Sequence, residues 1–120
     1  MSKSHRHIGN EAETLACNFL QQKGWEILDR NYYSGHSEID IIAKDKLYTV
    51  FIEVKMRSST QFGQPFEQVT EDKVEHIFRA AESWALDHGL ENSPMRFDVI
   101  GILKRKGKEP VVNHIPDAYR

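Results

Sequence analysis

Three charged side chains interrupt segments that are otherwise apolar and typical of buried β-strands. Asp40 lies among isoleucines, and Glu53 and Lys55 alternate with Ile52 and Val54. A buried charge is costly unless it is paired or bound to a metal ion. Side chains two positions apart in a strand point to the same face, so Glu53 and Lys55 should lie side by side. If the two segments are antiparallel neighbours, Asp40 shares that face, and two carboxylates and an ammonium group converge on one spot.

The chemistry that suits such a group is the binding of a hard divalent cation. Mg²⁺ takes a few oxygen ligands from a protein and completes its octahedron with water and phosphate oxygens. We therefore predict that Asp40 and Glu53 bind Mg²⁺ or Mn²⁺, which would polarise a phosphodiester and activate a water molecule. Because the two carboxylates favour the charged form of Lys55, we assign this residue to orienting the attacking water or stabilising the phosphorane charge, and not to acting as a free base.

The same residues allow a simpler interpretation. In a protein of ordinary composition, Glu-x-Lys occurs by chance about once in a few hundred residues. A structural ion pair between Glu53 and Lys55 at the edge of a sheet would also explain the pattern. This alternative stays open on the sequence of the two strands alone.

The apolar pattern predicts which elements hold these residues. Apolar residues three and four positions apart indicate a helix over residues 8–20, and Gly24 ends it. A second helix is predicted over residues 70–88, with Thr70 as its N-cap. Strands are predicted over residues 25–31, 38–44, 47–57, 96–103 and 111–115, with a turn at 32–37 and a loop at 58–65.

The order of these elements, α-β-β-β-α-β-β, predicts the fold class. The tight connection at residues 44–46 favours an antiparallel pair of strands on either side of it, and the long second helix allows a crossover. The sequence therefore predicts an α/β fold with a mixed central sheet flanked by helices. Strand alternation places Ile39 and Ile41 on one face of the second strand, opposite the face of Asp40.

Length and composition bound the remaining possibilities. The chain has 120 residues, which suits one domain over residues 1–120, with residues 1–7 expected to be flexible. The single cysteine, Cys17, excludes an intramolecular disulfide and a thiolate metal site, and its apolar neighbours predict a core position. The sequence contains neither a long apolar run nor a signal peptide, so we expect a cytoplasmic protein without a membrane span.

The distribution of charge narrows the class of partner. A net charge of −2 argues against a protein that coats nucleic acid through bulk positive charge. It does not exclude a nuclease, because clustered carboxylates lower the net charge while basic patches remain elsewhere. Two such patches are residues 3–7 and residues 104–108, and a solvated turn explains the second patch equally well.

Ordered motifs along the chain add a resemblance to a known family. Asp40 followed by Glu53-x-Lys55 on consecutive strands resembles the core of PD-(D/E)XK nucleases. The further motifs are Gly9-x-x-Ala12-Glu13-x-x-Ala16, Arg30-Asn31, residues 38–43, residues 50–57, Phe62-Gly63-x-Pro65, Lys73 and residues 96–99. Over nearly its whole length the chain is similar to the YraN-like family of uncharacterised small bacterial proteins. The resemblance implies a restriction-endonuclease-like three-layer fold, similar to that of Holliday-junction resolvases, and no settled substrate.

The resemblance also adds candidate site residues. Family members carry a glutamate at the position of Glu13, and related nucleases use an acid on a helix to help hold metal. This implies a metal-binding and catalytic role for Glu13, with a solvated helix glutamate as the alternative. Glu38 is a weaker candidate for the same site. Lys73 and Arg57 are candidates for contacting the phosphates of a nucleic acid, and ordinary surface charge is the alternative for each.

Three functions remain on these grounds. The leading hypothesis is a Mg²⁺- or Mn²⁺-dependent endonuclease that acts on branched or structured DNA. The second is a nucleic-acid-binding or adaptor protein that keeps the nuclease fold without catalysis, and the third is an interaction domain without a nucleic-acid partner. We expect nucleic acid, DNA before RNA, as the partner. The sequence leaves open the form of the substrate and whether the protein is a homodimer.

Overall fold

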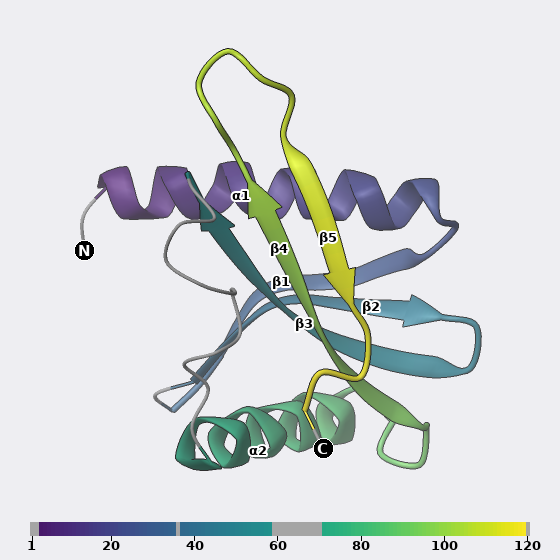
Figure 1. Ribbon diagram of the computed structural model, residues 1–120. Helices are drawn as coiled ribbons and strands as arrows, with labels where there is room; N and C mark the ends of the chain where they lie inside the picture. Colours follow the sequence, from purple (N-terminus) through teal and green to yellow (C-terminus); the bar gives the residue numbers. More distant parts are fainter. Residues whose placement is uncertain (1–2, 36, 59–70, 120) are drawn as a thin grey trace.

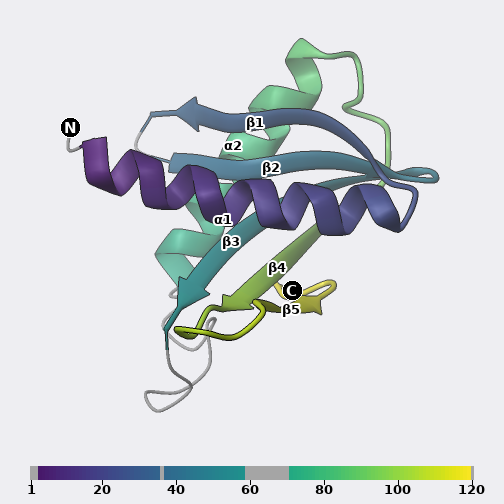
Figure 2. The ribbon, with the colours of Figure 1, turned by 90° about the horizontal axis from the view of Figure 1, so that it is seen from above.

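Two helices enclose a five-stranded sheet in this protein (Figure 1). The structure is a computed structural model that describes residues 3–35, 37–58 and 71–119. Along the chain the elements are α1 (Lys3–Gln22), β1 (Glu26–Ser34), β2 (Ser37–Asp45), β3 (Tyr48–Arg57), α2 (Glu71–Asp87), β4 (Met95–Leu103) and β5 (Val111–Ile115). Helix α1 lies across one face of the sheet and α2 covers the other (Figures 1 and 2). The predicted element order and the three-layer α/β arrangement are confirmed, consistent with a restriction-endonuclease-like fold.

The sheet has the order β1-β2-β3-β4-β5 and mixes both strand directions. Strands β1, β2 and β3 form an antiparallel meander, and Lys46 takes a φ of 56° in the tight turn between β2 and β3. Helix α2 then carries the chain across the sheet, so that β4 runs parallel to β3, and β5 returns antiparallel to β4. The structure confirms the predicted hairpin and the crossover through the long helix.

Each face of the sheet has its own apolar core. On the α1 face, Ala16 and Leu20 pack against Ile41, Val50 and Ile52 and related side chains of the central strands. Cys17 belongs to this cluster and is 6% exposed, which confirms its predicted core position. On the α2 face, the helix buries a stripe of side chains against the strands. The members of that cluster are Ile39, Ile42, Phe51, Ala80, Ala81 and Trp84.

The structure corrects the sequence-based boundaries in the first hairpin. The predicted turn at residues 32–37 is mostly strand, because β1 continues to Ser34. Asn31 has a φ of 56°, in the left-handed region, and the alternation of side chains reverses there. Arg30 donates a hydrogen bond to Thr14 on α1, whereas Tyr32 donates one to Ser83 on α2.

The same reversal makes the predicted face of Ile39 wrong. Ile39 packs into the α2-side cluster, whereas Ile41 packs into the α1-side cluster. Helix α1 also begins at Lys3, earlier than the predicted start at residue 8. The predicted N-cap Thr70 and all of the predicted 58–65 loop except Ser58 lie outside the described residues.

Candidate metal centre

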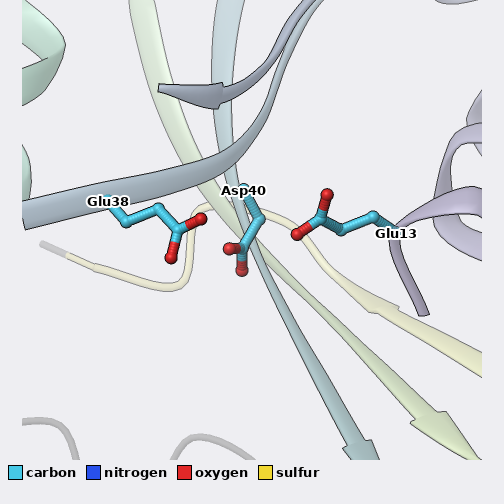
Figure 3. A group of neighbouring side chains, drawn as sticks. All are labelled: Glu13, Glu38 and Asp40. Carbon is cyan, nitrogen blue, oxygen red and sulfur yellow. The ribbon is translucent and has the colours of Figure 1, made fainter. Parts of the chain in front are cut away.

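Three carboxylates gather where β2 begins beneath α1. Glu13 comes from α1, and Glu38 and Asp40 come from β2. One oxygen of each lies within 4.8 Å of an oxygen of the other two. Figure 3 shows the three carboxylates turned toward one another, with Asp40 between the two glutamates. The sequence predicted Asp40 and Glu53 for such a site, the family resemblance added Glu13, and Glu38 ranked below them. The structure groups Glu13, Glu38 and Asp40.

The place of Asp40 results from a divergence of two strands. Strands β2 and β3 pair in regular register from Asp45 with Tyr48 up to Ile41 with Ile52, the last pair of the described register. Beyond this point β3 turns away from β2 (Figure 2). The Oδ2 atom of Asp40 accepts a hydrogen bond from the backbone N–H of Val54 at 2.8 Å. The side chain of Asp40 thus takes the place of a ladder hydrogen bond and is held at the opening between the strands.

Glu13 is the least exposed of the three acids, with 5% of the residue exposed. No described residue donates a hydrogen bond to its Oε1 atom, although the Arg30 guanidinium lies 3.7 Å from that atom. Burial raises the pKa of Glu13, and hydrogen bonding to Asn31 and the charge of Arg30 oppose this effect. Because a buried carboxylate oxygen without a hydrogen bond is costly and the Arg30 guanidinium lies beyond hydrogen-bond distance, a metal ion would be a closer partner for this atom.

The raised pKa of Asp40 also favours a bound cation at this place. Burial raises its pKa from 3.8 to about 7, and the charges of Glu38, Glu13 and Glu53 add to the rise against the opposing hydrogen bond from Val54. Crowded carboxylates of this kind repel one another unless a proton or a metal ion is present. Three hard oxygen donors, one of them without a hydrogen bond, fit Mg²⁺ or Mn²⁺. Glu13, Glu38 and Asp40 are therefore the residues that would hold such an ion.

Glu53 lies outside this three-carboxylate group among the described residues. Its Oε1 atom is 2.8 Å from the ammonium of Lys73 and 3.3 Å from that of Lys55. Its Oε2 atom accepts a 2.5 Å hydrogen bond from the hydroxyl of Tyr119. Burial raises the pKa of Glu53, but the bonds from Lys73 and Tyr119 and the charge of Lys55 outweigh it and lower the pKa below its usual range. The ion pair between Glu53 and Lys55, which the simpler interpretation expects, is present, and a metal-binding role for Glu53 remains a prediction.

A pocket of about 340 Å³ lies between Glu38 and Glu53. Glu38 and Glu53 both line it, together with Lys73 and His76 from the first turns of α2. A phosphate group in this space would lie close to Glu38, the one residue of the candidate centre among the lining residues, and to Lys73. The candidate phosphate-binding role of Lys73 therefore has a suitable location, although in this structure its ammonium is bound to Glu53.

Arg57 lies further along β3, at the end of the strand. It is partly buried, and its backbone carbonyl accepts a hydrogen bond from the N–H of Lys104 at 2.8 Å. The phosphate-binding role of Arg57 stays a prediction.

Sequence reasoning did not anticipate a buried ion network that holds the C-terminal segment. Asp98 is fully buried, accepts two 3.0 Å bonds from Arg96, and lies 2.7 Å from Nε2 of His114. It also accepts a hydrogen bond from the N–H of Asp117, two residues before Tyr119. The network thereby fixes the segment that brings the Tyr119 hydroxyl to Glu53. The only local signal was the charged pair Arg96-x-Asp98 in an apolar strand, and nothing local marked Tyr119.

Within the described ranges no helix is long and apolar enough to cross a membrane.

The family model and the relatives that this chain matches carry the same family name. Residues 12–102 match the uncharacterised protein family UPF0102. A UPF0102 protein of Trichlorobacter lovleyi is 38% identical over 120 residues, which cover 99% of this chain and 94% of the relative. A UPF0102 protein of Chlorobium phaeobacteroides is 38% identical, with 100% of this chain and 98% of the relative covered. A UPF0102 protein of Anaeromyxobacter dehalogenans is 39% identical over 93% of this chain and 83% of its own length.

Proposed function

Because this chain belongs to the uncharacterised protein family UPF0102, whose name assigns no activity, we propose a function from the site itself: a divalent-metal-dependent nuclease that hydrolyses phosphodiester bonds of structured or branched DNA. One observation carries the proposal. The Oε1 atom of Glu13 is buried without a hydrogen-bond donor inside a group of three carboxylates. A divalent cation would satisfy that atom and offset the repulsion within the group.

The roles of the residues follow from their positions. Glu13, Glu38 and Asp40 would hold Mg²⁺ or Mn²⁺, which supplies charge to the phosphate oxygens and makes a water molecule more acidic. Lys55 lies on β3 beside the pocket residue Glu53, and its ammonium would orient the attacking water and offset the charge that develops on phosphorus.

The neighbouring groups would bind the rest of the substrate. Lys73 lines the pocket and would contact the phosphate next to the scissile bond once its ammonium turns from Glu53. Tyr119 and Lys55 would then remain as the partners of Glu53 and keep its carboxylate ionised. Arg57, at the end of β3, would contact a more distant phosphate.

A second function has one observation in its favour. Both oxygens of Glu53 have partners within the protein, the ammonium groups of Lys55 and Lys73 on one and the hydroxyl of Tyr119 on the other. A residue so fully bound suits a structural ion pair, which is what a non-catalytic nucleic-acid-binding or adaptor protein would retain. The two functions differ in whether the protein turns over substrate when a metal ion is supplied.

The experiment is a cleavage assay with fluorescent substrates that differ in form. A four-way junction, a flap, a splayed duplex, a single strand and an RNA–DNA hybrid are each incubated with Mg²⁺, Mn²⁺ or Ca²⁺. The nuclease hypothesis expects cleavage of at least one branched or partly single-stranded DNA with Mg²⁺ or Mn²⁺, and binding without efficient cleavage in Ca²⁺. Salt-dependent binding of the panel without any cleavage would favour the adaptor.

The Lys55→Ala variant is the matched control for contaminating nucleases. It should lose cleavage by a hundredfold or more, on the order expected for a positioned group in the transition state. Its DNA affinity should change little, because affinity comes from several phosphate contacts. Cleavage equal to that of the unmodified protein would assign the activity to a contaminant or another site.

Two further expectations accompany the proposal. A nuclease of this kind would act in the cytoplasm, the compartment that the sequence predicts. Symmetric cleavage of a four-way junction requires two active centres, so junction specificity would require a homodimer, which a measured molecular mass of the complex with DNA would detect.

A further inference from the structure

The loop that joins β4 to β5 concentrates positive charge in a chain whose net charge is −2. Four of the five residues at positions 104–108 are basic, and all four are exposed. In the part of the chain that the structure describes, Lys104 pairs with Glu11 of α1, and no ion pair joins Arg105, Lys106 or Lys108 to an acid. Such a concentration of exposed positive charge attracts anions.

The loop holds these groups in a defined turn. The N–H of Lys108 donates a 3.1 Å hydrogen bond to the carbonyl of Arg105. Gly107 takes a φ of 75°, the left-handed conformation that the third residue of a type II turn requires. The residues at 104–109 surround an open hollow of about 510 Å³, in which Glu109 is the single acid. The turn therefore presents a cluster of cations of a size that suits phosphate groups.

Strand β3 gives an approximate distance between the loop and Glu53, which lines the same pocket as Glu38. It projects past α1 at the top of Figure 1 and begins beside the end of β3, where the N–H of Lys104 bonds to the carbonyl of Arg57. Strand β3 leads from Glu53 to Arg57, about 13 Å at roughly 3.3 Å per residue. The tip of the loop adds a further two residues and the step between strands, so the cations lie about 20 Å from Glu53.

We propose that this loop is an anchor for a duplex arm of the DNA, with Lys106 and Lys108 contacting backbone phosphates on the order of six base pairs from the pocket that Glu53 and Glu38 line. The inference rests on the proposed function, since it names where that substrate is held. A duplex suits the site because its phosphates keep a fixed spacing over this distance and its charge density is high. The anchor supplies affinity without reading sequence, because phosphate contacts carry no base information.

Removal of two charges from the loop tests the anchor. The variant Lys106→Gln/Lys108→Gln is compared with Lys44→Gln/Lys46→Gln, which removes two exposed lysines from around the β2–β3 turn. Both change the net charge equally. Affinity for a branched DNA with duplex arms of twelve base pairs is measured by fluorescence anisotropy in Ca²⁺ at a series of salt concentrations.

The loop variant should lower the slope of log affinity against log salt by about 1.8, at roughly 0.9 for each phosphate group that the variant no longer neutralises. At about 0.1 M salt this corresponds to up to about 60-fold weaker binding. The control should keep the slope of the unmodified protein. An unchanged slope in the loop variant, or an equal reduction in both variants, would overturn the anchor.

The length of the arm provides the second readout. Affinity of the unmodified protein should rise as a duplex arm grows from three to twelve base pairs, with most of the rise near six, and the loop variant should show no such rise. An equal rise with single-stranded arms of the same lengths would overturn the assignment to duplex. Cleavage of the same substrates in Mg²⁺ separates the two hypotheses. Loop-dependent binding without cleavage contradicts the nuclease and keeps the anchor, whereas cleavage with loop-independent binding contradicts the anchor alone.

Discussion

The substitution Asp40→Asn should stabilise the metal-free protein at alkaline pH. The pKa of Asp40 is about 7 in the folded protein, against 3.8 for the free side chain. A pKa that folding raises means that ionisation favours the unfolded chain. The stability associated with the protonated form is fully present below about pH 4 and is lost as the pH rises through about 7. Asparagine removes this loss because it has no proton to release.

The structure gives the size of the effect and a reason to expect that the fold persists. A difference of about three pKa units corresponds to up to about 4 kcal/mol at pH 8 and about 1.5 kcal/mol at pH 5. The side-chain oxygen of an asparagine can still accept the hydrogen bond from the N–H of Val54. Its amide group adds donors that face the carboxylates of Glu13 and Glu38.

The assay is urea unfolding at pH 5 and pH 8. Each measurement is made once in EDTA and once in Mg²⁺ without EDTA. The increase in stability from Asp40→Asn should be larger at pH 8, and Mg²⁺ should stabilise the unmodified protein but not the variant. Asp87→Asn, an equal change of charge at the exposed end of α2, should shift stability by less than about 0.5 kcal/mol at either pH. A less stable Asp40→Asn protein at pH 8 in EDTA would show that the carboxylate of Asp40 is a structural ion-pair partner, and would refute the reasoning.

Three further substitutions test separate parts of the account. Glu13→Gln should keep its stability in EDTA and lose the stabilisation by Mg²⁺ in a thermal melt, whereas an unchanged response to Mg²⁺ would exclude Glu13 as a ligand. Tyr119→Phe should cost about 1.5–3 kcal/mol at pH 7, because the ionised Glu53 loses a hydrogen bond. The pKa of Glu53 is lowered in the fold from its ordinary value of 4.5, so this cost should shrink as the pH falls below that value, and a cost that stays constant with pH would point to packing alone. Asp98→Asn should cost about 3 kcal/mol or more in urea unfolding, since it leaves the charge of Arg96 poorly compensated, and a neutral result would show that the network is not structural.

The sequence predicts the order of elements and the mixed sheet because both depend on local patterns. Apolar residues three and four apart mark the helices, and the tight connection at Lys46 and the long α2 dictate which neighbours are antiparallel and which are parallel. The face of Ile39 was not predictable in this way. It depends on the left-handed backbone at Asn31 in the neighbouring strand, a conformation that the residue type permits but does not require.

The candidate site was only partly predictable for a related reason. Asp40 and Glu53 face each other in an ideal hairpin, but β2 and β3 diverge after Ile41 and Ile52, so their carboxylates have different surroundings. The proximity of Glu13 to Asp40 depends on how α1 packs on the sheet, and the resemblance to a family supplied it. Tyr119 lies 66 positions from Glu53, and only the tertiary structure brings the two together.

The most direct test of the central claim is a crystal of the protein grown or soaked in Mn²⁺ at pH 8, with diffraction recorded at the manganese absorption edge. We expect an anomalous peak between Glu13, Glu38 and Asp40, with an oxygen of each at coordination distance and Oε1 of Glu13 among them. The same experiment on Asp40→Asn should show no peak there. A well-ordered site without a peak in the unmodified protein, with Arg30 bonded to Glu13 instead, would contradict the claim.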